Sequence, residues 1–205
     1  MKLYLIRHGE TDLNKQRILQ GQSDFDLNDY GRELAEKTRD GLKDVAFDVV
    51  FTSPLKRAKE TAEIIVRGRA PQPLFIEDRR IQEISFGEFE GLCCGKEHYN
   101  IPDKDFNYFF QAPDKYRVPK GGESFEEVIA RTGEFLKEIT GRQEYADKTV
   151  LVSTHGCALK ALLANIRPTP LSEFWGQGVH KNCAVTIVEA EEGKFTVVEE
   201  GKLYY

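Results

Sequence analysis

Two apolar segments, far apart in the chain, each lead directly into a histidine followed by a glycine. Residues 3–6 precede Arg7-His8-Gly9, and residues 149–153 precede Thr154-His155-Gly156. In α/β proteins, ligands bind at the carboxyl ends of parallel strands. A glycine after each histidine allows the backbone to turn sharply and to approach a ligand closely. The two segments therefore predict that His8 and His155 lie together at one edge of a sheet.

The length and charge of the chain restrict the kind of protein and the partners it can have. The 205 residues, with 40% hydrophobic and 31% charged side chains, are typical of a globular domain large enough to bury a core without disulfides. A net charge of -5 argues against binding to a nucleic-acid backbone, and an anionic small substrate would need a locally basic pocket. We expect one domain over residues 1–205 and no nucleic-acid partner.

Cysteine usage and hydropathy give expectations about location and cofactors. The longest early apolar run, residues 3–6, is too short for the core of a signal peptide, and no segment approaches the length of a membrane span. Cys93 and Cys94 are adjacent, and Cys157 and Cys183 stand alone, which predicts neither a disulfide framework nor a zinc site. We therefore expect a cytoplasmic protein with no membrane partner, no metal and no other cofactor.

Helix and strand signals alternate along the chain, as they do in α/β proteins. Helices are predicted at 31–44, 55 to about 67, 124 to about 141 and 157–165, and strands at 47–52, 149–154, 184–189 and 195–199. The last two strands form a hairpin around Glu192-Gly193, and residues 74–76 and 80–84 are predicted to be short extended pieces. Ser53-Pro54 and Ser124-Phe125-Glu126-Glu127 are typical helix starts. The pattern predicts an α/β fold, a three-layer α/β/α sandwich around a mainly parallel sheet.

Residues 85–122 lack regular periodicity and are rich in aromatic side chains. A long segment of this kind within a compact domain is usually a functional loop or lid. We therefore expect an inserted cap at about 85–122, with helical pieces of its own.

Arg57 is expected near the two histidines. It falls in the first turn of the helix that follows Ser53-Pro54, and helical side chains lean toward the N-terminus of their helix. Arg57 would then reach back over the edge of the sheet. By position alone, a solvated arginine like the neighbouring Lys56 fits equally well, and either histidine alone would fit an ordinary loop between a strand and a helix. Together with Arg7, the set favours a site.

Four motifs, in order along the chain, resemble those of the histidine phosphatase superfamily, which includes cofactor-dependent phosphoglycerate mutases and many small-molecule phosphatases. They are Leu5-Ile6-Arg7-His8-Gly9-Glu10-Thr11 with Asn14, the segment 52–62 around Arg57, Glu83, and Ser153-Thr154-His155-Gly156. The match spans residues 1 to about 165. A lone Arg-His-Gly would be a weak signal, whereas four motifs in order are highly specific.

The resemblance implies that His8 is the nucleophile, which takes the phosphoryl group on a ring nitrogen. Arg7, Arg57 and His155 would surround the phosphoryl oxygens, and Asn14 would add a neutral donor. Phosphoryl transfer depends chiefly on positioning and on neutralising charge at these oxygens, and the planar guanidinium suits both tasks. Nearby positive charge also favours neutral imidazole, the nucleophilic form.

The resemblance further implies that Glu83 protonates the leaving oxygen and then activates water. Spacing alone does not separate Glu83 from its acidic neighbours, which include Glu88 and Glu90. Gln20-Gly21-Gln22 resembles the family segment that touches substrate, although an ordinary turn fits equally well, and Gly156 belongs with the substrate-binding residues. Four cations of the cap either bind a second anionic group or form a solvated rim: Lys96, Lys115, Arg117 and Lys120.

Three functions remain open, and hydrolysis is favoured. A mutase must retain a bisphosphorylated intermediate, which needs several more cations; family mutases are longer and carry paired arginines after the glutamate, whereas Arg79-Arg80 precede Glu83 here. A non-catalytic phosphate-binding module would typically have lost one of the core residues that this chain keeps. We expect a metal-independent phosphatase for a small phosphorylated metabolite, and the aromatic cap favours a substrate with some apolar or ring character.

Overall fold

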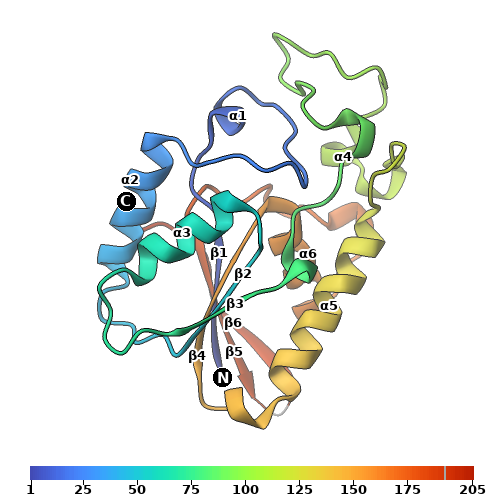
Figure 1. The fold of residues 1–205 in the computed structure, drawn as a ribbon. Helices are drawn as coiled ribbons and strands as arrows, with labels where there is room; N and C mark the ends of the chain where they lie inside the picture. The colour runs from blue at the N-terminus through green and yellow to red at the C-terminus, as the bar shows by residue number, and fades with distance from the viewer. Residues whose placement is uncertain (192) are drawn as a thin grey trace.

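A mixed six-stranded sheet lies at the centre of the computed structural model, which describes residues 1–191 and 193–205 (Figure 1). The strands are β1 (Lys2–Arg7), β2 (Val49–Thr52), β3 (Leu74–Glu77), β4 (Thr149–Thr154), β5 (Val185–Glu191) and β6 (Lys194–Lys202). Their order is β3-β2-β4-β1-β5-β6. The first four strands pair in parallel, and β5 and β6 join as an antiparallel hairpin at the β1 side. The predicted mainly parallel sheet is confirmed. The predicted turn of the last hairpin contains Glu192, which lies outside the described residues.

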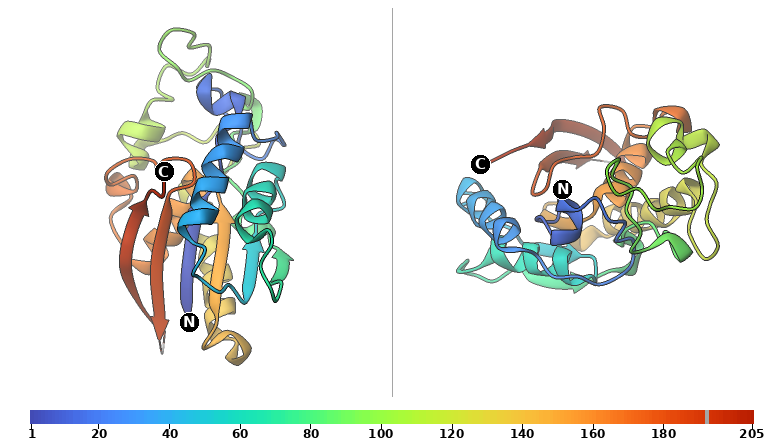
Figure 2. Two further views of the ribbon diagram at one scale, coloured as in Figure 1. Left: turned by 90° about the vertical axis from the view of Figure 1, so that its left-hand side faces the viewer. Right: turned by 90° about the horizontal axis from the view of Figure 1, so that it is seen from above.

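Helices cover both faces of the sheet (Figure 2). They are α1 (Asp12–Lys15), α2 (Asp29–Gly41), α3 (Lys56–Val66), α4 (Tyr108–Gln111), α5 (Phe125–Gly141) and α6 (Gly156–Ile166). Alternate side chains of β1 face opposite layers: Ile6 packs in the cluster of α2 and α3, whereas Leu5 packs with Phe135 of α5 and Leu159 of α6. The three-layer α/β/α arrangement is therefore confirmed. No helix of the described residues is long and apolar enough to cross a membrane.

Two local predictions near the site are wrong. Ser53 is not the N-cap of α3, which begins at Lys56 after Leu55; the Ser53 hydroxyl accepts the Leu55 N–H at 3.3 Å and lies 2.8 Å from the His155 Nε2. Residues 80–84 are not an extended piece, because the 3₁₀ helix η1 (Arg79–Ile81) turns the chain there. The Asp78 carboxylate caps η1 by accepting the Arg80 N–H at 2.8 Å. By contrast, the predicted capping box of Ser124 and Glu127 opens α5.

The cap at residues 85–122 lies over the carboxyl ends of the parallel strands (Figure 1). As predicted, it holds helical pieces: η2 (Gly87–Phe89), α4 and η3 (Pro113–Lys115). Two further 3₁₀ helices lie outside it, η4 (Gln143–Tyr145) and η5 (Leu171–Glu173). Phe109 stacks on Phe125 of α5 with ring centroids 5.0 Å apart and meets Trp175 edge-on at 5.3 Å. Most of the aromatic rings of the cap thus form a core of their own instead of a surface for substrate.

Candidate active site

The two histidine-glycine turns meet where β1 and β4 end. The strands are neighbours with Arg7 opposite Thr154, and the His8 N–H donates to the Thr154 carbonyl at 2.9 Å. The rings of His8 and His155 are consequently neighbours, with centroids 5.1 Å apart. The pairing that the sequence predicted from two distant segments is therefore present in the fold.

His8 is held as a neutral imidazole with one free nitrogen. Its Nδ1 lies 2.6 Å from the Gly9 carbonyl, which can only accept, so Nδ1 carries the hydrogen and Nε2 carries the lone pair. Burial first, and then the charges of Arg57 and Arg7, lower the pKa of His8 well below its usual value. His8 is therefore a neutral imidazole at neutral pH, which is the form that can act as a nucleophile.

His155 is fully buried beside His8. Its Nε2 lies 2.8 Å from the Ser53 hydroxyl, and its Nδ1 has no partner among the described residues. Burial, followed by the charge of Arg57, lowers the pKa of His155 well below its usual value. As far as the structure describes the chain, the lining of the cavity includes His8 and Gly156 but not His155.

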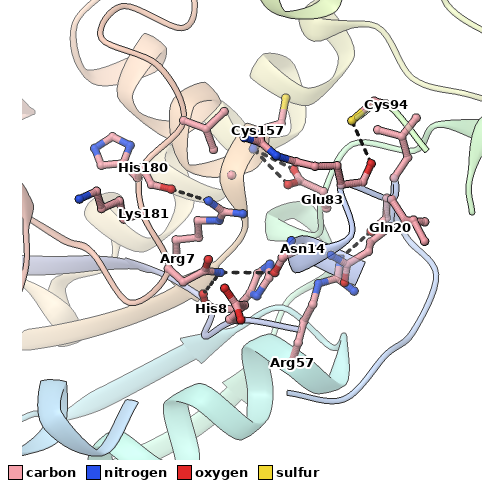
Figure 3. A pocket seen from close by; sticks show the side chains of 18 of the residues that line it. Arg7, His8, Asn14, Gln20, Arg57, Glu83, Cys94, Cys157, His180 and Lys181 are labelled. Carbon is pink, nitrogen blue, oxygen red and sulfur yellow. Dashed lines mark hydrogen bonds between the residues drawn. The ribbon is translucent and has the colours of Figure 1, made fainter. Parts of the chain in front are cut away.

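Arg7 and Arg57 bring two buried guanidinium groups to the same cavity (Figure 3). Arg7 donates to the His180 carbonyl at 2.5 Å, and Arg57 donates to the carbonyls of Ser23 and Gly21 at 2.8 and 2.7 Å. The Nε atom of each arginine lacks a partner among the described residues. Burial lowers the pKa of Arg57 to about 10, so it stays charged at neutral pH. Two charged guanidinium groups therefore line one cavity beside His8.

Glu83 faces this space from the opposite wall (Figure 3). Its Oε1 accepts the N–H groups of Ile84, Cys157 and Ala158 at 3.0, 3.0 and 3.1 Å. Two of these donors belong to the first turn of α6, where a helix favours negative charge. At Gly156, an added Cβ would crowd the side chain of Val179 at 3.0 Å, whereas its 3.5 Å distance from the Glu83 Oε2 would be an ordinary contact.

An ion pair between Arg131 of α5 and Glu123, which precedes α5, fixes the segment that carries Glu83. The Arg131 guanidinium donates to the carbonyls of Arg80, Gln82 and Glu83 at 2.7, 2.8 and 3.0 Å. It also pairs with Glu123 at 2.9 Å, and Glu123 accepts the Ser85 N–H. We call Arg131 and Glu123 the clamp of Glu83. The sequence did not predict this clamp, because its bonds join segments that are far apart in the chain, and neither residue is in the described lining of the cavity.

The loop after β1 supplies the remaining predicted site residues. Thr11 caps α1 in a capping box with Asn14, which lines the cavity. Gln20 and Gly21 line it as well: the Gln20 Oε1 accepts the Thr11 hydroxyl at 2.9 Å, and the Gly21 carbonyl binds Arg57. Gly21 has φ 48°, and a Cβ there would lie 2.2 Å from the Glu90 carboxylate. The structure therefore brings together Arg7, His8, Asn14, Gln20, Gly21, Arg57, Glu83 and Gly156, with His155 behind them.

The cavity has a volume of about 540 Å³. Several residues of its lining were not predicted from the sequence. Lys181 and Asn182 come from the irregular chain before β5, and Arg17 follows α1. Trp175 adds to an aromatic wall with Phe86, Phe109 and Phe110. No periodic signal marks residues 167–184, and only a contact map would have identified them.

The four cap cations lie elsewhere. Lys96, Lys115, Arg117 and Lys120 are exposed, and the described lining of the cavity includes none of them. They fit the solvated-rim alternative. The described residues also hold no group of three or more His, Cys, Asp or Glu side chains that is placed to bind a metal ion.

Comparison with known proteins gives the family. The model of the histidine phosphatase superfamily (branch 1) matches residues 3–202. The chain is 30% identical over 199 residues to phosphoserine phosphatase 1 of Hydrogenobacter thermophilus, which covers 97% of this chain and 91% of that protein. It is 36% identical over 162 residues to the uncharacterized phosphatase PhoE of Bacillus subtilis, and this match covers 79% of this chain and 75% of that protein. The solved structure of YhfR from Bacillus stearothermophilus matches with a TM-score of 0.88 and 38% identity over 98% of this chain and 97% of that chain. The chain belongs to branch 1 of the histidine phosphatase superfamily.

Proposed function

We propose that this protein is a metal-independent phosphatase that hydrolyses a small phosphorylated metabolite through a phosphohistidine intermediate at His8. The observation that carries the proposal is the state of His8: its Nδ1–H is bound to the Gly9 carbonyl, and its free Nε2 faces a cavity with two guanidinium groups. The names of phosphatase relatives support the hydrolytic activity.

In the first step, Nε2 of His8 attacks phosphorus, and the ester oxygen leaves with a proton from the carboxylic acid form of Glu83. Arg7 and Arg57 neutralise charge on the phosphoryl oxygens. The phosphorylated ring is cationic, and the Nδ1–H bond to Gly9 stabilises this charge. In the second step, the Glu83 carboxylate takes a proton from water, water attacks phosphorus, and the N–P bond breaks to release phosphate and free His8.

Hydrolysis accounts for the site better than mutase-type transfer does. A bisphosphorylated intermediate would need many cations around it, but the cations of the cap lie outside the cavity, and its described lining adds only Arg17 and Lys181 to Arg7 and Arg57. Arg80 pairs with Asp78 and Glu138 and so is not available to a substrate. Cavities of about 300–1,000 Å³ typically hold small ligands, and the aromatic wall suits a ring or another apolar part of the substrate. A non-catalytic role would leave the free His8 nitrogen unexplained.

Metal independence is a direct test of the proposed chemistry. Two guanidinium groups already supply the positive charge that a divalent ion supplies in other phosphatases. We therefore expect hydrolysis of p-nitrophenyl phosphate to proceed at the same rate with and without EDTA. Loss of the activity on chelation, with recovery on adding Mg²⁺ or Zn²⁺, would contradict the proposal.

Arg131 is expected to act as a positioning residue for Glu83. Arg131→Gln removes three bonds to the segment 80–83 and leaves Glu123 unpaired, so we expect about 2 kcal/mol lower stability. Since Glu83 would be misplaced, hydrolysis of an alkyl phosphate should fall about tenfold, and that of p-nitrophenyl phosphate less.

The matched control is Arg142→Gln, because Arg142 pairs with Glu138 and Glu144 at the exposed end of α5. This variant should keep both activities. Equal losses on the two esters in Arg131→Gln would mean that the clamp contributes to stability alone.

A further inference from the structure

We propose that Arg17 and Lys181 form a second anion-binding subsite at the mouth of the catalytic cavity. This subsite would select phosphomonoesters that carry a carboxylate in addition to the phosphate. Both side chains line the cavity that contains His8. The inference rests on the proposed function, because it takes the phosphate of the substrate to lie between Arg7 and Arg57.

Arg17 is fixed at the mouth by its backbone while its guanidinium is left free. The Arg17 N–H donates to the Asn14 carbonyl at 3.1 Å, and the Arg17 carbonyl accepts from the N–H of Cys94 at 2.9 Å. Its φ of 58° lies in the left-handed region, which is unfavourable for a residue with a side chain. Its guanidinium makes no hydrogen bond or ion pair with the described residues, so the placement serves no visible contact within the chain.

Lys181 is presented by two neighbours that bind catalytic groups (Figure 3). The His180 carbonyl accepts from Arg7, and the Asn182 amide donates to the His8 carbonyl at 3.0 Å. Residues 180–182 are thereby joined to the floor of the cavity, and the ammonium of Lys181 has no carboxylate within ion-pair distance among the described residues. A substrate held by Arg7 would therefore lie beside the segment that carries Lys181.

Neither of these two cations forms an ion pair with a carboxylate of the cavity among the described residues. Arg7 and Arg57 match the two negative charges of a phosphate ester. The two carboxylates of the described lining accept from neutral N–H groups: Glu10 accepts from the Asn28 amide at 3.0 Å, and Glu83 accepts from the beginning of α6. Burial, and more weakly the nearby charge of Arg17, lower the pKa of Arg7, which places the two guanidinium groups within electrostatic reach. An anion at the mouth would relieve this repulsion.

Two pairs of esters test the subsite, and the members of each pair differ only by a carboxylate. The distance between phosphate and carboxylate is short in one pair and long in the other. The short pair is O-phosphoserine and O-phosphoethanolamine, and the long pair is 4-carboxyphenyl phosphate and phenyl phosphate. In the wild type, kcat/KM should favour the carboxylate in at least one pair. In Arg17→Gln/Lys181→Gln, this preference should fall about tenfold, the contribution of a charge-assisted hydrogen bond, while the carboxylate-free esters keep their rates.

Arg79→Gln and Lys120→Gln together form the matched control. Arg79 and Lys120 are exposed and lie outside the described lining of the cavity, so this double variant should keep the full preference. An equal loss of preference in the control would overturn the proposal, because it would show a general effect of surface charge.

Calorimetric binding to His8→Ala keeps the test independent of the proposed reaction. The carboxylate-bearing ester of the preferred pair should bind about tenfold more tightly than its partner, and the two substitutions should remove this difference. Equal affinities within both pairs, or a preference that survives the two substitutions, would overturn the subsite. Failure of the phosphohistidine mechanism would leave this binding difference in place, so the two failures can be told apart.

Discussion

Replacing His8 with alanine should reduce the turnover of every phosphomonoester by at least about 10⁴-fold, because the variant lacks the atom that accepts the phosphoryl group in the proposed mechanism. The two guanidinium groups remain, so phosphate esters should still bind. The measurement is kcat for p-nitrophenyl phosphate and for an alkyl phosphate.

His98→Ala is the matched control, because His98 is exposed in the cap and lies outside the described lining of the cavity. It should keep wild-type rates. Substantial turnover by His8→Ala, beyond any trace of wild-type enzyme, would rule out His8 as the nucleophile.

Replacing Glu83 with glutamine should have an effect that depends on the leaving group. An alkoxide needs a proton as it leaves, so hydrolysis of an alkyl phosphate should fall by about 10²–10⁴-fold, the usual contribution of general acid catalysis. Nitrophenolate leaves without a proton, so phosphorylation of His8 by p-nitrophenyl phosphate should be much less affected. Since Glu83 also activates water in the proposed mechanism, dephosphorylation should become limiting. Stopped-flow measurements should then show a burst of nitrophenol followed by slow turnover.

Two neighbouring carboxylates serve as comparisons for Glu83. Glu88 is exposed, and Glu88→Gln should retain activity on both esters. Glu90 accepts the N–H groups of Gln22 and Ser23, each at 2.9 Å, so it holds the loop that contacts Arg57 and is not an equivalent control. Equal losses on both esters in Glu83→Gln, without a burst, would assign Glu83 a structural role.

Local sequence patterns were sufficient to predict the centre of the site. Each histidine-glycine turn follows a buried strand, and parallel pairing of β1 with β4 is enough to make His8 and His155 neighbours. The position of Arg57 in the first turn of α3 fitted a site residue and a solvated arginine equally well, and the family resemblance selected the site. The positions of these residues depend on local backbone geometry and on the sheet edge at which parallel strands end.

The mouth of the cavity could not be predicted in the same way. Lys181 and Trp175 come from irregular chain whose path depends on contacts with β1 and the cap, and such contacts leave no periodic pattern in the sequence. Ser53 shows the same limit: its local signal is that of a helix cap, but the hydroxyl binds His155 across the sheet edge. Aromatic content likewise did not distinguish rings that form the core of the cap from rings that face the substrate.

The most direct measurement traps the intermediate. Glu83→Gln should be mixed with a ³²P-labelled aryl phosphate and denatured in alkali, and the labelled peptide should then be identified by mass spectrometry. Slow dephosphorylation in this variant should let the label approach one phosphoryl group per chain. We predict a label on the Nε2 atom of His8 that is stable to alkali and labile to acid, and that is absent when His8 is also replaced by alanine. A label on serine, aspartate or another histidine, or no label during rapid release of nitrophenol, would contradict the account.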